Sequence, residues 1–203
     1  MTRRAILYLL AGLIMSGCVR LPSPGQPVTY HVLTDPGPIV PAPRTLAGTL
    51  LVREMDAPGL YQASNPVFSR SPGTRTYYQF ARWSEPPAKR LTWLIRQRLE
   101  AARAFEVVSP LGGGVRGDYQ LNTRLVDFYH DASMPPGVAL LIVEAELVRR
   151  SDARLIARRM FVGQAPAATH DAQGATDAMG RAANQVIDDL ALWLPQAAAG
   201  EGR

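Results

Sequence analysis

The side chains that could support catalysis or bind a metal are few in this chain and far apart in sequence. The three histidines, His31, His130 and His170, fall in three different predicted elements, and no H-x-x-H or H-E-x-x-H pair occurs. His130 and Asp131 are adjacent, but neighbouring side chains of a strand point apart, which predicts a solvated loop edge. We therefore predict no catalytic residue, no metal site and no cofactor.

Charged side chains are paired at several places without forming an obvious site. Glu144 and Glu146 are two apart, so they share one face of a predicted strand, most simply the solvated face. Asp188-Asp189 is expected to face solvent on the last predicted helix. Arg149-Arg150 and Arg158-Arg159 flank a predicted hairpin turn. They favour a charged edge that opposes strand addition, and the alternative is a site for an acidic partner or lipid head groups.

An aromatic run is the strongest candidate for a binding surface. Tyr77, Tyr78, Phe80 and Trp83 lie within seven residues, and Arg82 lies among them. Aromatic residues and arginine are enriched in the energetic centres of protein interfaces. We predict that these five residues bind a partner, and the alternative is that the aromatic rings cap one end of the core.

Cys18 is the only cysteine, and it closes an N-terminal segment typical of an export signal. Arg3 and Arg4 precede an uncharged stretch, residues 5–15, that is too short to cross a bilayer. The last four residues of the segment resemble the bacterial lipobox, an apolar residue and two small residues before cysteine: Met15, Ser16, Gly17 and Cys18. Residues 1–17 are therefore predicted to be a lipoprotein signal peptide, and the alternatives are an uncleaved anchor or a buried first helix.

The lipobox resemblance implies that Cys18 becomes the first mature residue and carries two or three acyl chains, such as palmitate. Several chains hold a protein on a membrane far more firmly than one chain does. Val19 and Arg20 follow, without the aspartate that commonly retains lipoproteins at the inner membrane. The resemblance therefore favours the periplasmic face of the outer membrane over the inner membrane.

Length and charge indicate the number of domains and the kinds of partner that the protein can bind. The length from Cys18 to Arg203 suits one domain. The formal charge falls from +5 to +3 once Arg3 and Arg4 are removed, and no run of five basic residues occurs. A nucleic acid is therefore not expected as a partner.

The pattern of apolar residues predicts a tether, a single domain at 28–195 and a disordered tail at 196–203. Prolines in 18–27 predict an extended tether. Alternation predicts strands at 28–33, 49–55, 76–83, 105–109, 118–130, 138–149 and 154–163. Tyr119, Leu121, Thr123, Leu125 and Asp127 are expected on one face. Apolar residues at helical spacing predict helices at 88–104 and 171–194, the second ended by Pro195.

This order of elements predicts an α/β fold of two layers: a mixed, largely antiparallel sheet with two amphipathic helices packed on one face. Gly112-Gly113-Gly114 precedes a strand rather than the helix that a phosphate-binding loop needs, so we predict a turn there.

Several segments together resemble a known family. They are the lipobox, the opening strand Tyr30-His31-Val32-Leu33, the segment Tyr77-Tyr78-Gln79-Phe80-Ala81-Arg82-Trp83 before Pro86, and Phe105-Glu106-Val107-Val108 after an arginine-rich helix. This combination, over residues 28–194, resembles the auxiliary lipoproteins of ABC-type transport systems, which include the paraquat-inducible C-type lipoproteins.

The resemblance implies a non-enzymatic accessory component of a transport system with a substrate-binding protein of the MCE type as its partner. Such systems are thought to move lipids or other hydrophobic compounds between the two membranes of Gram-negative bacteria. We also leave open a homo-oligomer. The alternatives are a lipid-anchored periplasmic enzyme and a stand-alone lipid-binding protein.

Overall fold

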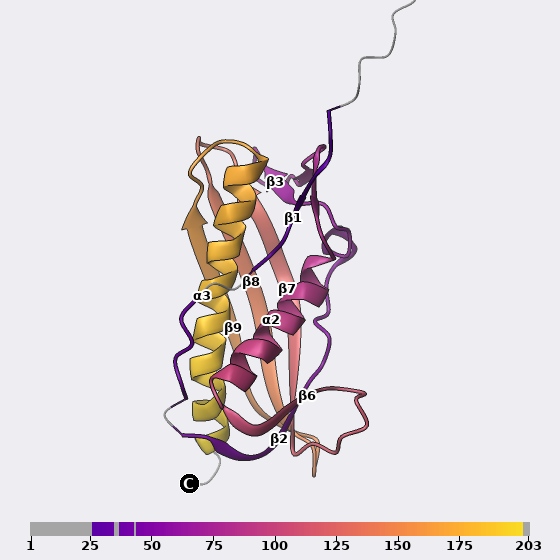
Figure 1. Ribbon diagram of the computed structural model, residues 1–203, viewed down its shortest axis with the longest axis vertical. Coiled ribbons are helices and arrows are strands. Elements are labelled where there is room, and N and C mark those ends of the chain that lie inside the picture. Colours follow the sequence, from indigo (N-terminus) through magenta and orange to yellow (C-terminus); the bar gives the residue numbers. More distant parts are fainter. Residues whose placement is uncertain (1–25, 35–36, 43, 201–203) are drawn as a thin grey trace, which may run out of the picture.

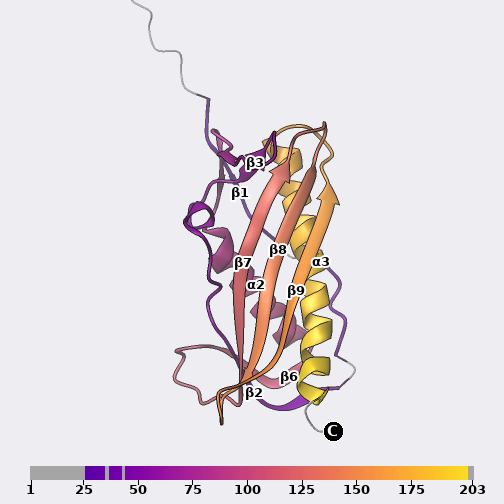
Figure 2. The ribbon, with the colours of Figure 1, turned by 180° about the vertical axis from the view of Figure 1, so that it is seen from behind.

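Two layers, a sheet and a pair of helices, make up the computed structural model, which describes residues 26–34, 37–42 and 44–200. The centre of the sheet is an antiparallel meander of three long strands: β7 (Tyr119–Asp131), β8 (Val138–Arg149) and β9 (Arg154–Pro166). Two helices, α2 (Pro87–Ala101) and α3 (Ala172–Ala199), cover one face of it (Figure 1). The view from behind shows the opposite face without a helix in front of it (Figure 2). The predicted fold class is confirmed.

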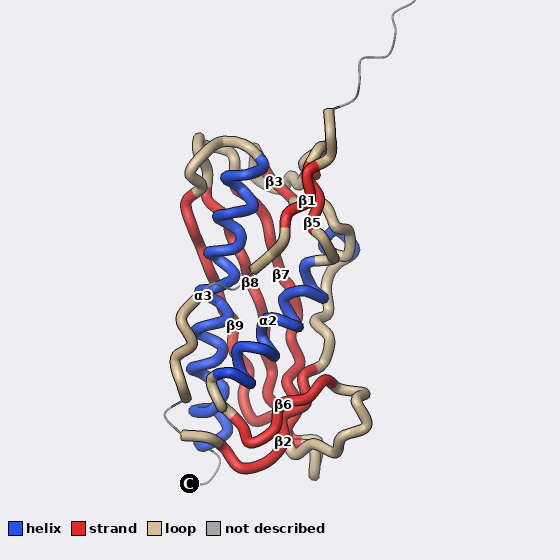
Figure 3. The backbone as a smooth tube through the Cα atoms, viewed as in Figure 1, coloured by secondary structure: helices blue, strands red, loops and turns tan. Residues whose placement is uncertain are grey.

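Shorter strands extend the sheet at both ends of β7. β2 (Leu46–Val52) runs parallel to the start of β7 and to β6 (Phe105–Pro110). β3 (Val67–Ser69) runs parallel to the end of β7 and pairs with β4 (Thr76–Tyr77). A separate parallel pair is formed by β1 (Thr29–His31) and β5 (Ala81–Trp83), and η1 (Gly59–Tyr61) is a short 3-10 helix (Figure 3).

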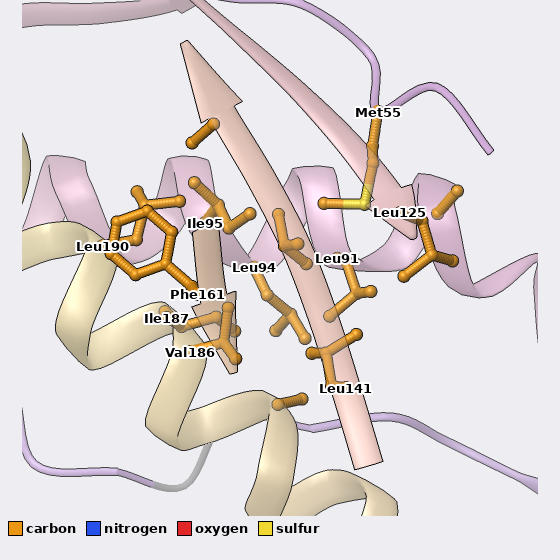
Figure 4. Close-up of a cluster of buried hydrophobic side chains, with 14 of the residues drawn as sticks. Met55, Leu91, Leu94, Ile95, Leu125, Leu141, Phe161, Val186, Ile187 and Leu190 are labelled. Atoms are coloured by element: carbon orange, nitrogen blue, oxygen red, sulfur yellow. The ribbon is translucent and has the colours of Figure 1, made fainter. Parts of the chain in front are cut away.

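One hydrophobic cluster fills the space between the sheet and both helices. Leu91, Leu94 and Ile95 of α2 face Val186, Ile187 and Leu190 of α3 and the inner face of the meander, as the close-up shows (Figure 4). Burial of such side chains contributes about 1.5–3 kcal/mol each, so this cluster is the main source of stability. Within the described residues, no helix is long and apolar enough to cross a membrane.

Because β7 contains a β-bulge, the predicted alternation of its side chains is wrong beyond Leu125. The pairing with β8 shifts between Leu125 and Asp127, so that Val126 is an extra residue. Leu121 and Leu125 face the core as predicted, but after the bulge it is Phe128 that is buried. Without the bulge the strand would bury the carboxylate of Asp127 and expose Phe128, which costs several kcal/mol.

Two predicted boundaries of strands are wrong. The predicted strand 49–55 lies instead at β2, Leu46–Val52, because Leu46 pairs with Phe105 of β6. The predicted strand 76–83 is divided into β4 and β5, which belong to different sheets. The division falls at residues 78–80, where Tyr78 turns toward β7.

The ends of the helices also differ from the prediction. Asp171 caps α3 rather than belonging to it, since its carboxylate accepts a 2.8 Å hydrogen bond from the Gly174 N–H. Pro195 lies inside α3, which continues to Ala199, so residues 196–199 are helical and not the predicted disordered tail. Proline removes one helical hydrogen bond, but Leu194 and Ala198 on either side are buried in the core, which holds the last turn in place.

Candidate functional site

The two ends of the meander have different side chains, and the candidate site residues divide between them. We call one the tether end: it holds the β7–β8 loop, the start of α3, the β1–β5 pair and residue 26, where the described chain begins (Figure 1). We call the other the arginine end: it holds the β8–β9 turn and the loop between β6 and β7. The predicted aromatic run belongs to the tether end. Cys18 and the lipobox residues Met15, Ser16 and Gly17 lie outside the described residues.

Trp83 of the aromatic run is a core residue, so its prediction as a contact residue is wrong. The side chain is buried, its ring stacks on Phe128 at 6.1 Å between centroids, and the His31 ring meets it edge-on at 6.4 Å. The bulge in β7 turns Phe128 inward, and this explains the contact: Phe128 becomes the platform on which Trp83 rests.

Tyr78 is half-buried and is held by His130. The Tyr78 hydroxyl lies 2.8 Å from His130 Nδ1, and His130 Nε2 lies 3.0 Å from the Pro136 carbonyl. The carbonyl can only accept, so Nε2 carries the proton, and the Tyr78 hydroxyl donates to Nδ1. Burial raises the pKa of Tyr78 to about 12. Tyr78 is therefore a neutral, internally bonded side chain.

His130 itself is completely buried, which corrects its prediction as part of a solvated loop edge. Burial lowers the pKa of its imidazole, so the ring is neutral at pH 7. Gly137 has φ of +96°, and a Cβ atom there would lie 2.1 Å from His130 Nε2, so the loop closes tightly over the ring. The His170 ring approaches His130 edge-on at 6.1 Å. The alternation of apolar residues in the sequence does not predict this cluster, because the cluster depends on the bulge in β7.

The Arg82 side chain is also hydrogen-bonded within the domain, and it fixes the turn between β4 and β5. Its Nη1 donates to the carbonyls of Tyr78, Gln79 and Ala81 at 3.3, 3.1 and 2.8 Å. Three carbonyls gathered on one guanidinium fix the turn and present the residue at its tip, Phe80, which is 38% exposed. Tyr77 is 37% exposed, and its hydroxyl donates to the Leu60 carbonyl. The exposed members of the predicted run are therefore Tyr77 and Phe80.

A second network attaches this segment to the open face of the sheet. Arg75 Nη2 lies 2.6 Å from Asp127 Oδ2, and its guanidinium lies 3.6 Å from the centre of the Tyr129 ring. The Tyr61 hydroxyl donates to Asp127, and burial together with this bond raises the pKa of Tyr61 to about 12. The hydrogen bond to Asp127 also raises the pKa of Arg75. Asp127 is available for these contacts because the bulge turns it outward.

Sequence reasoning missed the exposed side chains of β1 and of the β7–β8 loop. Tyr30 is 70% exposed, Val28 43% and Met134 76%, and they lie at the tether end with Phe80. A groove of about 620 Å³ separates β1 and β5 from the start of α3, and residues 26 and 27 line it together with Phe80. The exposed tip of the run and the point where the chain leaves toward Cys18 are thus adjacent.

The arginine end carries a cluster of charged side chains beside exposed apolar ones, which are Leu111, Val115 and Leu155. Arg116, Arg149 and Arg150 line a groove of about 610 Å³ beside Asp118, and Arg154 begins β9 opposite Arg149. Arg149 is partly balanced by Asp152, at 2.7 Å.

The predicted contribution of the second arginine pair to this end is wrong. Arg158 lies farther along β9 on the open face, 3.2 Å from Glu144 and 2.5 Å from Glu146. Glu144 and Glu146 therefore share the open face as predicted. Arg159 lies over the Phe161 ring at 5.1 Å.

The two helices are joined by an ion pair that the sequence did not reveal. Arg98 of α2 is buried and pairs with Asp188 of α3, so Asp188 is engaged in the fold rather than simply solvated. In the described part of the chain, no three His, Cys, Asp or Glu side chains gather closely enough to hold a metal ion.

Comparisons with known proteins match this chain to one family. The family model described as "ABC-type transport auxiliary lipoprotein component" matches residues 31–191. No curated protein matches the chain.

Solved structures share the fold at low sequence identity. Protein XCC0632 from Xanthomonas campestris is 22% identical, with a TM-score of 0.78 over 86% of this chain and 99% of that chain. An uncharacterized protein is 15% identical, with a TM-score of 0.64 over 82% and 97%. The hypothetical protein CT253 from Chlamydia trachomatis is 6% identical, with a TM-score of 0.51 over 76% and 99%. These similarities concern the fold alone. The family match, which spans most of the chain, shows that this protein belongs to the ABC-type transport auxiliary lipoprotein components.

Proposed function

We propose that the protein is a lipid-anchored, non-enzymatic accessory component of an ABC-type system that moves lipids or other hydrophobic compounds between the membranes of a Gram-negative bacterium. The observation that carries this proposal is the family match over residues 31–191, preceded by a single cysteine at the end of a lipobox. In this proposal Cys18 is acylated and holds the protein at the periplasmic face of the outer membrane.

The mechanism is positional. The acyl chains fix the protein to one membrane, residues 19–27 set how far the domain reaches, and the domain meets a substrate-binding protein of the MCE type. The ATPase and the permease are separate chains. The protein contributes location and contact surface, and the transported compound is bound by its partners.

Two surfaces supply contacts in this proposal. Tyr77 and Phe80 are the exposed members of the aromatic run, and they remain candidate contact residues at the tether end, on the side of the anchoring membrane. The arginine end is the second surface, and it meets the MCE-type protein. Arg116 and Arg150 are exposed there, and exposed charges steer the approach of an oppositely charged partner. An acidic region of the MCE-type protein is the expected counterpart.

Affinity purification from membranes tests the proposal. The tagged full-length protein is solubilised in mild detergent after brief chemical cross-linking, and the captured proteins are identified by mass spectrometry. Recovery of an MCE-type protein with the lipidated chain supports the proposal. Recovery of the lipidated chain without any component of an ABC-type system, while a known membrane complex survives the same procedure, would contradict it.

A further inference from the structure

The tether end carries apolar side chains that the fold leaves in solvent. The exposed residues Val28, Tyr30, Phe80 and Met134 come from three separate segments, which are β1 with the residue before it, the turn between β4 and β5, and the β7–β8 loop, and these segments lie at this end (Figures 1 and 2). We call these four residues the tether-end patch. Apolar surface gathered from separate segments and left uncovered marks a place where another apolar surface docks.

The segments of the patch are held rigidly with respect to one another. Arg82 fixes the turn that carries Phe80, and β1 pairs with β5 so that Tyr30 lies opposite Arg82. The loop that carries Met134 is held by His130, whose Nε2 donates to the Pro136 carbonyl. The Tyr78 hydroxyl joins the two sides, because it donates to His130 from the segment that ends in Phe80. A fold that fixes exposed apolar residues in this way presents them as a surface.

We propose that the tether-end patch lies in the head-group region of the bilayer that holds the acyl chains of Cys18. This inference rests on the proposed anchoring through Cys18. Tyrosine and phenylalanine suit a membrane interface, where one part of a side chain contacts acyl chains and another contacts water. Arg70 directly follows β3, which pairs with the end of β7, and it is exposed, so its guanidinium is available there to lipid phosphates.

The length of the chain between Cys18 and Gln26 excludes the opposite orientation. Eight residue steps join Cys18 to Gln26, and a fully extended chain covers at most about 3.6 Å per residue, so the tether spans at most about 29 Å. β8 has 12 residues, and at about 3.3 Å per residue the arginine end lies about 40 Å from the tether end. The domain therefore cannot stand on its arginine end, although arginines suit anionic head groups.

Site-specific fluorescence tests the proposal with the full-length, lipidated chain. Cys18 is the only cysteine and is consumed by acylation, so one new cysteine gives a unique site for an NBD label. The test positions are Phe80→Cys and Met134→Cys, and the matched control is Leu155→Cys at the arginine end, whose exposure, 45%, is close to that of Phe80. The vesicles contain phosphatidylethanolamine and phosphatidylglycerol with a nitroxide lipid as quencher.

We expect roughly a twofold loss of fluorescence at positions 80 and 134, and little loss at position 155, because an apolar face at the interface is buried about 5–10 Å into the boundary between head groups and acyl chains. Equal quenching at all three positions would overturn the proposal, as would no quenching at 80 and 134 in protein that floats with the vesicles. Protein that does not float at all would overturn the anchoring itself, so the two failures are distinguishable.

Discussion

The tether end and the arginine end of the same meander differ in their histidines and in their exposed charge, although both expose apolar side chains, which at the arginine end are Leu111, Val115 and Leu155. All three histidines and four exposed apolar side chains belong to the tether end, whereas Arg116, Arg149, Arg150 and Arg154 belong to the arginine end. The first end has a buried neutral network beneath an apolar surface. The second has exposed charge in solvated loops. A domain that must be oriented between a membrane and a partner needs such a difference, because two equivalent ends would give no preferred direction.

The largest effect expected from this comparison is the loss of anchoring. Cys18→Ala removes the acylated atom, so we expect the protein to leave the membrane fraction almost completely, since the tether-end patch alone provides far less affinity than acyl chains. Val19→Ala is the matched control and should stay in the membrane fraction. Membrane fractionation with immunodetection measures both. Equal membrane retention of the two variants would contradict the proposed anchor.

The next largest effect separates the buried from the exposed part of the aromatic run. Trp83→Ala removes a core ring that stacks on Phe128, so we expect the free energy of unfolding to fall by about 3–5 kcal/mol. Phe80→Ala removes an exposed ring, and its effect should stay within about 0.5 kcal/mol. Urea denaturation followed by circular dichroism measures both. Similar losses for the two variants would show that the assigned burial is incorrect.

Between about pH 7 and pH 5, acid should act mainly on the tether end, because the lowered pKa of Asp152 keeps its pair with Arg149 intact in this range. The pKa of His130 is lowered in the folded protein, so the unfolded chain binds more protons below about pH 6.5, and stability present at higher pH is lost on acidification, by up to about 1.4 kcal/mol per pH unit. Tyr78, His170, Asp131 and the Pro136 carbonyl face this ring. His130→Gln should flatten the pH dependence of the unfolding free energy.

Two comparisons sharpen the prediction on acid. His170→Gln serves as the control and should keep most of the dependence, because the His170 side chain is exposed. In hydrogen exchange, residues 76–80 and 130–137 should lose protection on acidification, whereas residues 147–157 should not. Equal loss of protection at both ends would show that His130 is not the source of the pH response.

The smallest expected effect concerns charge at the arginine end. Arg116→Ala should weaken the affinity for the MCE-type partner by about threefold, because an exposed charge contributes at most about 1 kcal/mol. Lys89→Ala removes one exposed positive charge at the start of α2 and should leave the affinity unchanged. Biolayer interferometry at two salt concentrations measures both. An equal effect of the two substitutions would indicate a general charge effect rather than a surface at the arginine end.

Most of the fold could be predicted from alternation and helical spacing, because long strands and amphipathic helices repeat their signal over many residues. Leu121, Leu125 and the residues of β8 follow that signal. The bulge at Val126 could not be predicted, since it depends on whether Asp127 or Phe128 faces the core. That one insertion decides the surroundings of Trp83, Tyr78 and His130, and so it decides which aromatic residues are exposed.

The sequence indicates that the aromatic run is a candidate surface, but only the structure shows which of its members are exposed. The run was assigned to a surface from composition, yet composition carries no information on which ring meets Phe128 or His130. Tyr30 and Met134 lie far from the run in sequence and join Phe80 only through tertiary structure. The last turn of α3, beyond Pro195, could not be predicted either. A proline inside a helix is tolerated only where packing on both sides compensates for it, and here Leu194 and Ala198 supply that packing.

Site-specific photo-cross-linking in living cells distinguishes a tether end that faces the membrane and an arginine end that faces the transporter from the reverse orientation. The photoreactive residue p-benzoylphenylalanine is placed at Leu155 or at Phe80 in the full-length chain, in a strain that expresses the transport system. We expect cross-links to an MCE-type protein from position 155 and none from position 80. Cross-links to that protein from position 80 and none from position 155 would contradict the proposed orientation.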